Sequence, residues 1–105
     1  MATFSQLELL AREIEARAFS SPDSSYTAKL LSKGVDKCAK KLGEEAVELV
    51  IAAVEKNKTE VTKEAADVLY HLLVMLAARD VTLQDVLTEL DRREGTSGIE
   101  ERANR

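Results

Sequence analysis

Proline, glycine and cysteine are scarce in this chain. Its 105 residues include one proline, four glycines and one cysteine, whereas 45% of the residues are hydrophobic. This composition excludes a collagen-like or a disordered chain, so we expect one globular domain over residues 1–105. The single cysteine, Cys38, excludes an intrachain disulfide and suits the reducing cytoplasm, where we expect the protein to work.

Long apolar runs and an excess of positive charge are missing as well. The longest apolar stretch after Asp67 is interrupted by His71 and ends at Arg79, short of the roughly 18 residues that span a bilayer. The N-terminal segment lacks a cationic start followed by an apolar block, so we expect no signal peptide. The net charge is −4, whereas a general nucleic-acid binder carries a basic surface. We therefore expect neither a membrane nor a nucleic acid as a partner.

Hydrophobic residues recur at three- and four-residue steps over most of the chain, which predicts helices and no strands. The expected helices cover residues 3–19, 26–34, 36–56, 57–79 and 82–95, followed by a polar C-terminal tail, residues 95–105. The predicted helix boundaries rest on a capping box of Thr3 with Gln6, a stop at Gly34, and caps at Asp36, at Asn57 with Glu60, and at Thr82.

The two middle helices carry apolar residues on nearly all sides. Within residues 46–54 only Glu48 is polar, and within residues 65–78 only Asp67 and His71 are clearly polar. Helices of this kind are buried all round, and the chain has only two other helices of any length to cover them. We therefore predict an all-α helical bundle, built on a central antiparallel hairpin of these two helices and completed by dimerisation with a second copy.

Carboxylates interrupt these apolar helices at matched positions. Glu45 and Glu48 are three residues apart, as are Glu64 and Asp67, so each pair projects from one side of its helix. In an antiparallel hairpin whose turn centres on position 56, Glu48 reaches the level of Glu64 and Glu45 reaches that of Asp67. Glu44, one turn before Glu48, borders the four-carboxylate cluster.

Such a cluster is destabilising when it stands alone, because like charges repel and burial disfavours the charged form. A divalent cation removes this repulsion, and oxygen-only ligands suit Mg²⁺, Mn²⁺ or Ca²⁺. We therefore predict that Glu45, Glu48, Glu64 and Asp67 bind Mg²⁺, with Mn²⁺ as a substitute. The alternative is a solvated acidic face paired with lysines, which the apolar surroundings disfavour.

A group of lysines precedes the acids: Lys29, Lys33, Lys37, Lys40 and Lys41. Lysines hold polyphosphate oxygens as point charges. We favour Lys37 and Lys41, which lie nearest the acids in the sequence, and then Lys33. The alternative, a solvated helix face that pairs with Glu44 and Glu45, stays open.

Two further side chains, His71 and Arg102, have two interpretations each, whereas Tyr70 has one. His71 lies four residues after Asp67, where it either hydrogen-bonds an acid or substrate group or packs as a core residue. Tyr70 is expected to pack. Arg102, with Arg105, either closes over a bound polyphosphate or belongs to a frayed terminus.

Four segments together resemble the phosphoribosyl-ATP pyrophosphohydrolase family: SYTAKLL, KLGEEAVE, EAADVLYHLL and the terminal SGIEERANR. The E-x-x-E and E-x-x-D core is also found in the wider MazG-like superfamily of all-α nucleoside-triphosphate pyrophosphohydrolases, so the flanking segments carry the narrower match. The resemblance covers roughly residues 7–105.

The resemblance implies a Mg²⁺-dependent homodimer that hydrolyses phosphoribosyl-ATP to phosphoribosyl-AMP and pyrophosphate, the second step of histidine biosynthesis. The family's metal-binding acids correspond by position to Glu45, Glu48, Glu64 and Asp67. An adjoining acid of the family, which orients water or a ligand, corresponds to Glu44. Two alternatives remain from the residues alone. One is a housecleaning enzyme that acts on nucleoside or deoxynucleoside triphosphates, and the other is a non-catalytic helical dimerisation module.

Overall fold

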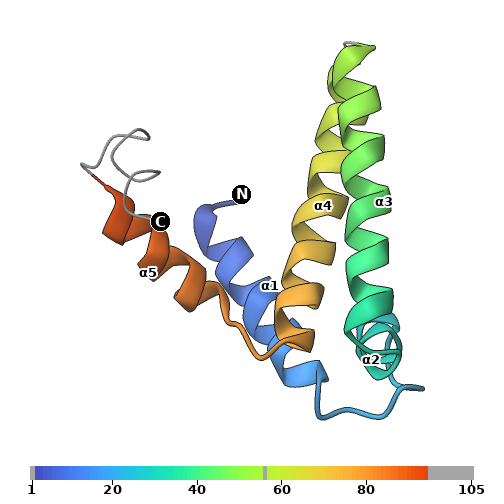
Figure 1. Cartoon of the computed structure of the whole chain (residues 1–105), viewed down its shortest axis with the longest axis vertical. Helices are drawn as coiled ribbons and strands as arrows, with labels where there is room; N and C mark the ends of the chain where they lie inside the picture. Colours follow the sequence, from blue (N-terminus) through green and yellow to red (C-terminus); the bar gives the residue numbers. More distant parts are fainter. Residues whose placement is uncertain (1, 56, 95–105) are drawn as a thin grey trace.

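The computed structural model describes residues 2–55 and 57–94, and these residues form the all-α fold that the sequence predicts (Figure 1). Five helices follow one another: α1 (Phe4–Arg17), α2 (Tyr26–Ser32), α3 (Val35–Val54), α4 (Lys58–Ala78) and α5 (Leu83–Arg93). The predicted end of the last helix at Gly95 and the polar tail lie outside the described residues. Within the described ranges, no helix is both long enough and apolar enough to cross a bilayer.

The two longest helices, α3 and α4, lie side by side along most of their length and are joined by residues 55–57 (Figure 1). The short helix α2 lies at the start of α3, and α1 packs near the C-terminal half of α4. Helix α5 leads away from the α3–α4 pair. The acidic residues of the sequence are therefore placed on two adjoining helices, away from α1 and α5.

The hydrophobic core lies where the first four helices meet. It is formed by buried residues of α1, α2, α3 and α4: Ala11, Ile14, Leu30, Cys38, Leu73 and Val74. The Cys38 thiol donates to the Leu30 carbonyl oxygen at 3.4 Å, and its burial agrees with the expectation of an unbridged cysteine. This core fixes α2 and the first half of α3 against the second half of α4.

Two predicted caps are confirmed. Asn57 Oδ1 accepts a hydrogen bond from the Glu60 backbone N–H at 3.0 Å, at the start of α4. Thr82 starts α5 with a full capping box. Its hydroxyl accepts from the Asp85 N–H at 3.1 Å, and an Asp85 carboxylate oxygen accepts from the Thr82 N–H at 2.9 Å. Each cap satisfies backbone donors that the first helical turn leaves free.

Two other predicted caps are wrong. Thr3 occupies the N-cap position of α1, but its hydroxyl hydrogen-bonds to the Ser5 hydroxyl at 2.6 Å instead of capping the backbone. Asp36 lies in the first turn of α3, and the N-cap is Gly34. Gly34 has φ +89° and ψ 174°, a backbone conformation that is essentially restricted to glycine. That conformation ends α2 and starts α3 within two residues, so Asp36 falls inside the helix.

A row of apolar side chains on α3 is exposed in the single chain. Val47, Val50, Ile51 and Val54 have between 51% and 75% of their surface accessible. The sequence predicts burial for these positions through a second copy of the chain. Dimerisation stays a prediction, and this exposed row defines the surface that a second copy would cover.

Candidate metal centre

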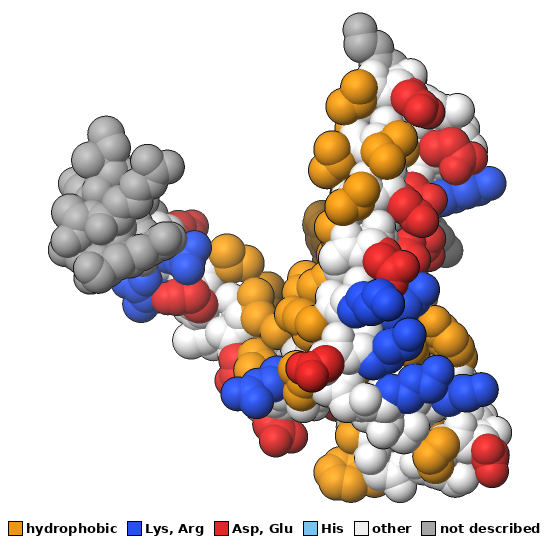
Figure 2. All heavy atoms as spheres, turned by 45° about the vertical axis from the view of Figure 1, so that its right-hand side comes forward, with side chains coloured by type: hydrophobic (Ala, Val, Ile, Leu, Met, Phe, Trp, Pro, Cys, Tyr) orange, Lys and Arg blue, Asp and Glu red, His pale blue; other side chains and the backbone are white. Residues whose placement is uncertain are grey.

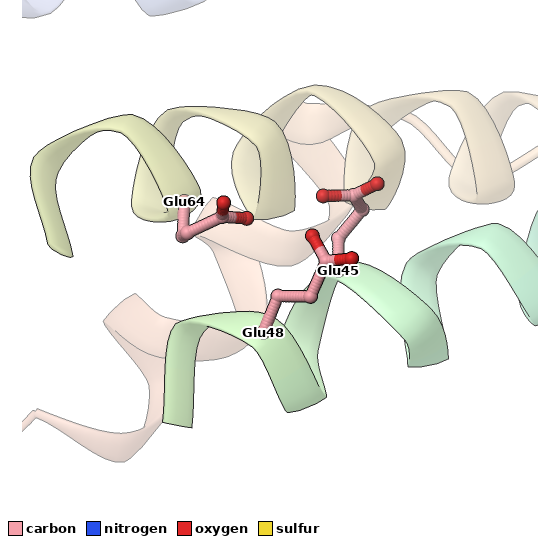
Figure 3. A group of neighbouring side chains, drawn as sticks. All are labelled: Glu45, Glu48 and Glu64. Carbon is pink, nitrogen blue, oxygen red and sulfur yellow. The ribbon is translucent and has the colours of Figure 1, made fainter. Parts of the chain in front are cut away.

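The acidic side chains are brought together because α3 and α4 pack along their length. Glu45 and Glu48 lie one turn apart on α3, and Glu64 comes from the second turn of α4 (Figure 3). In Figure 3 the carboxylates of Glu45 and Glu48 point toward α4, and that of Glu64 lies beside them. One carboxylate oxygen from each of the three residues lies within 4.8 Å of the others. We call these three residues the carboxylate cluster.

The spacing of the carboxylate cluster fits a divalent cation. Oxygen ligands bind Mg²⁺ at about 2.1 Å and Ca²⁺ at up to about 2.6 Å, so two ligands on opposite sides of an ion are about 4.2–5.2 Å apart. The three carboxylate oxygens lie within 4.8 Å of one another, which is close enough for them to meet on one cation. All the donors are carboxylate oxygens, which suit Mg²⁺ or Mn²⁺.

Glu64 is the member of the cluster whose ionised form is disfavoured by its surroundings. Its Oε2 atom is buried and has no hydrogen-bond partner among the described residues. Burial raises the pKa of the Glu64 carboxyl above its ordinary value, and the nearby Glu48 carboxylate, to which a protonated Glu64 can donate, raises it further. The negative charges of Glu48, Asp67 and Glu45 raise the same pKa. A cation would reverse these effects, because it favours the ionised carboxylate and supplies a partner for the free oxygen.

Asp67 and Glu44 are exposed and lie outside the three-residue carboxylate cluster. Asp67 is nevertheless close enough for its charge to raise the pKa of Glu64. It follows Glu64 by three residues on α4 and therefore lies on the same side of that helix. The structure thus places Asp67 at the edge of the cluster, and Glu44 next to Glu45 but outside the cluster.

The predicted lysines begin immediately beside the acids. The Lys41 ammonium lies 3.9 Å from a Glu45 carboxylate oxygen, and both side chains are mostly buried. Lys37 is half-buried one turn earlier, whereas Lys33 is exposed and is the C-cap residue that follows α2. Figure 2 shows acidic side chains along one edge of the α3–α4 pair and basic side chains directly next to them. The Lys41–Glu45 ion pair agrees in part with the alternative of lysine pairing, but it neutralises only one charge of the cluster. Arg102 lies outside the described residues.

An aromatic group near the centre was not predicted. The rings of Tyr26 on α2 and Tyr70 on α4 are stacked, with centroids 6.5 Å apart and planes inclined by 17°. The hydroxyls of Thr27 and Tyr70 form a hydrogen bond. His71 is buried and meets the Tyr70 ring edge-on at 5.0 Å. A sequence pattern that places Tyr70 near Asp67 does not reveal this stack, because it depends on how α2 packs against α4.

These features are typical of proteins that transfer or cleave phosphate groups. The chain is all-α, carries an oxygen-lined candidate cation centre between two helices, and has lysines beside that centre. Carboxylates that hold a divalent cation and cations that hold phosphate oxygens are the recurring parts of phosphate-transferring and phosphate-cleaving sites.

Comparisons with known proteins narrow this class. Residues 7–94 match the phosphoribosyl-ATP pyrophosphohydrolase family. A protein of Cereibacter sphaeroides named phosphoribosyl-ATP pyrophosphatase is 64% identical over 101 residues, which cover 96% of this chain and 98% of that protein. A protein of the same name from Paracoccus denitrificans is 64% identical over 94% of this chain and 92% of its own length. Another, from Dinoroseobacter shibae, is 63% identical over 96% of this chain and 99% of its own length. The chain therefore belongs to the phosphoribosyl-ATP pyrophosphohydrolase family, which confirms the resemblance and makes it a hydrolase of a phosphoanhydride bond.

Proposed function

We propose that the chain hydrolyses phosphoribosyl-ATP to phosphoribosyl-AMP and pyrophosphate, the second step of histidine biosynthesis, with Mg²⁺ as the cofactor and Mn²⁺ as a substitute. The observation that carries the proposal is the convergence of Glu45, Glu48 and Glu64 within 4.8 Å beside the Lys41 ammonium. The family membership supplies the substrate class. The single buried cysteine suits a cytoplasmic enzyme.

The carboxylate cluster would hold the cation, with Asp67 as a further ligand at its edge. When bound, Mg²⁺ neutralises charge that develops on the phosphate oxygens during cleavage. Lys41 and Lys37 lie one and two turns before Glu45 on α3, where their ammonium groups would hold the polyphosphate as point charges. Glu44, exposed beside the cluster, would orient water or a ligand.

In the proposed reaction, one water oxygen bonds to phosphorus at the linkage between the α- and β-phosphates. The bridging P–O bond breaks, and the phosphate group on the far side of that bond leaves with the electron pair, which gives phosphoribosyl-AMP and pyrophosphate. The proton that the water loses passes to solvent or to a carboxylate of the site. Neither an activated serine nor an activated cysteine is required, and Cys38 is buried in the core away from this centre.

The enzyme would act as a homodimer. Val47, Val50 and Ile51 lie on one stretch of α3 and are each more than half exposed in the single chain. A second copy that covers this row would bury apolar surface that a monomer leaves in water. Light scattering should give the mass of a dimer. Val50→Asp should weaken the association, whereas Leu9→Asp, at a similarly exposed position of α1, should leave it intact. A monomer at micromolar concentration would contradict this part of the proposal.

The substrate assignment is tested by pyrophosphate release. Phosphoribosyl-ATP and a panel of nucleoside and deoxynucleoside triphosphates are compared at equal concentration with Mg²⁺. Phosphoribosyl-ATP should be turned over with the highest kcat/KM. Glu48→Gln should abolish most of the activity, and Glu13→Gln, an exposed position on α1, serves as the matched control. Turnover of the triphosphate panel without turnover of phosphoribosyl-ATP would instead assign a housecleaning role.

A further inference from the structure

Tyr26 is an exposed aromatic residue that is held in a fixed place. It is the first residue of α2, and 56% of its surface is accessible. One side of its ring stacks against Tyr70, whose ring is part of the layer that packs on the hydrophobic core. The hydrogen bond between the Thr27 and Tyr70 hydroxyls ties α2 to α4 at the same point. Tyr26 therefore remains more than half exposed to solvent while its ring stacks on Tyr70.

The stack of Tyr26 on Tyr70 lies beyond the carboxylate cluster in the direction of the lysines. Tyr70 follows Asp67 by three residues and Glu64 by six on α4, so it lies about 9 Å further along the helix than Glu64. On the neighbouring helix, Lys41 and Lys37 occupy the stretch between Glu45 and the start of α3, next to α2. The acids thus lie at one level of the α3–α4 pair, and the Tyr70 ring lies further along it, near the level of Lys41.

This offset between acids and rings suits a purine nucleotide with its cation. The cation and the phosphates come first, and the base lies at the far end of the ribose. An aromatic ring binds a purine base by stacking, because both present flat π-faces that are poorly hydrated. The core does not account for the exposed ring of Tyr26, because more than half of this residue remains in water.

We propose that Tyr26 is the base-stacking residue of the substrate site, and that Tyr70 and Thr27 position it. The purine ring of the nucleotide lies against the exposed face of Tyr26 while its phosphates lie beside the lysines. This inference rests on the proposed function, because it assigns the part of the nucleotide that the carboxylate cluster and the lysines do not bind.

The chain offers a direct probe of this site, because Tyr26 and Tyr70 are its only tyrosines. The ring proton signals of the two tyrosines are followed by NMR while ATP, or inorganic tripolyphosphate, is added with Mg²⁺. ATP carries a purine and tripolyphosphate does not. Stacking predicts that ATP shifts the Tyr26 ring signals strongly, and that tripolyphosphate leaves them nearly unchanged. Equal shifts with both ligands, or no shift with ATP, would overturn the assignment.

Variants give an independent measure in the complete enzyme. Tyr26→Ala should raise the KM for phosphoribosyl-ATP about tenfold, the size of one base–aromatic stack, with a smaller change in kcat and unchanged affinity for tripolyphosphate. Tyr26→Phe keeps the ring and should restore the KM. Phe19→Ala removes another highly exposed aromatic ring and serves as the control. Circular dichroism establishes that each variant is folded.

The outcomes separate this inference from the proposed function. Activity of the wild type with an unchanged KM in Tyr26→Ala would refute base stacking and leave the proposed function intact. A wild type that releases no pyrophosphate from phosphoribosyl-ATP would refute the proposed function. The NMR titration with ATP would then still decide whether Tyr26 binds a purine.

Discussion

Gly34→Ala adds only one methyl group, yet it should lower the free energy of unfolding clearly. Its φ of +89° with ψ of 174° lies in a region that only glycine adopts readily, and a Cβ added there meets no atom within 4 Å. The cost of Gly34→Ala is therefore a backbone cost, about 1–3 kcal/mol. The lower entropy of alanine in the unfolded chain offsets about 0.4–1 kcal/mol of it. We expect a net loss of about 1–2 kcal/mol.

This loss converts into a measurable change in melting temperature. The entropy of unfolding is about 2.1 cal/mol/K per residue, or about 0.22 kcal/mol/K for 105 residues. The Tm of Gly34→Ala should therefore fall by about 5–9 °C when thermal unfolding is followed by circular dichroism.

Gly43→Ala is a matched control that should change the Tm in the opposite direction. It lies inside α3, and a Cβ added there also meets no atom within 4 Å. Alanine is favoured over glycine in a helix interior by about 1 kcal/mol, so Gly43→Ala should raise the Tm by about 4 °C at the same protein concentration. A Tm for Gly34→Ala equal to or above that of the wild type would refute the reasoning, as would shifts of the same sign in both variants.

Three further results are expected. Because the pKa of Glu64 is raised, the folded protein binds that proton more tightly than the unfolded chain does. Without metal, the free energy of unfolding should therefore fall as pH rises from about 4.3 through the raised pKa. Urea unfolding in EDTA should show this slope, and its persistence in Glu64→Gln would argue against Glu64 as its cause. Asp80 has φ +57° and follows Arg79, the C-cap of α4, so Asp80→Gly should raise the free energy of unfolding by about 0.5–1 kcal/mol, and a loss of stability in urea would contradict this account. Burial raises the pKa of the Cys38 thiol, so DTNB should modify the folded protein far more slowly than the urea-unfolded chain, and equal rates would show that the thiol is not protected.

Much of the helical fold follows from local signals in the sequence. Asn57 and Thr82 cap helices as predicted, because their side chains meet backbone N–H groups only three residues away. Thr3 and Asp36 have equally suitable side chains and do not cap. The Thr3 hydroxyl is taken by Ser5, and the backbone conformation of Gly34 starts α3 before Asp36 is reached. Caps are therefore predictable where no neighbouring residue competes for the same hydrogen bond or boundary.

The sequence predicts how far along the two helices the acidic residues lie. It does not predict how their side chains are arranged across the helix pair. Counting from the turn near position 56 places Glu48 level with Glu64, and the structure brings both together with Glu45. The same counting gives Asp67 an equal place, yet Asp67 is exposed at the edge of the cluster. Sequence spacing places Asp67 on the same side of α4 as Glu64, but it does not specify where the end of the side chain lies.

The stack of Tyr26 on Tyr70 shows what spacing cannot reveal. The two residues are far apart in the sequence, and their contact depends on α2 lying against α4. The sequence predicts that Tyr70 packs, and it does pack against the core, but the residue that stacks on its ring comes from a separate helix. Pairwise contacts of this kind require the tertiary arrangement.

The central claim is that the carboxylate cluster binds a divalent cation, and a Mg²⁺ titration of thermal stability tests it most directly. A ligand that binds only the folded state stabilises it by about 2.7 kcal/mol at 100 times its Kd. The Tm of the wild type and of Glu13→Gln should rise with Mg²⁺, whereas the Tm of Glu48→Gln should stay nearly constant. A wild type whose Tm does not respond to Mg²⁺ or Mn²⁺, or a Glu48→Gln variant that responds as the wild type does, would contradict the account.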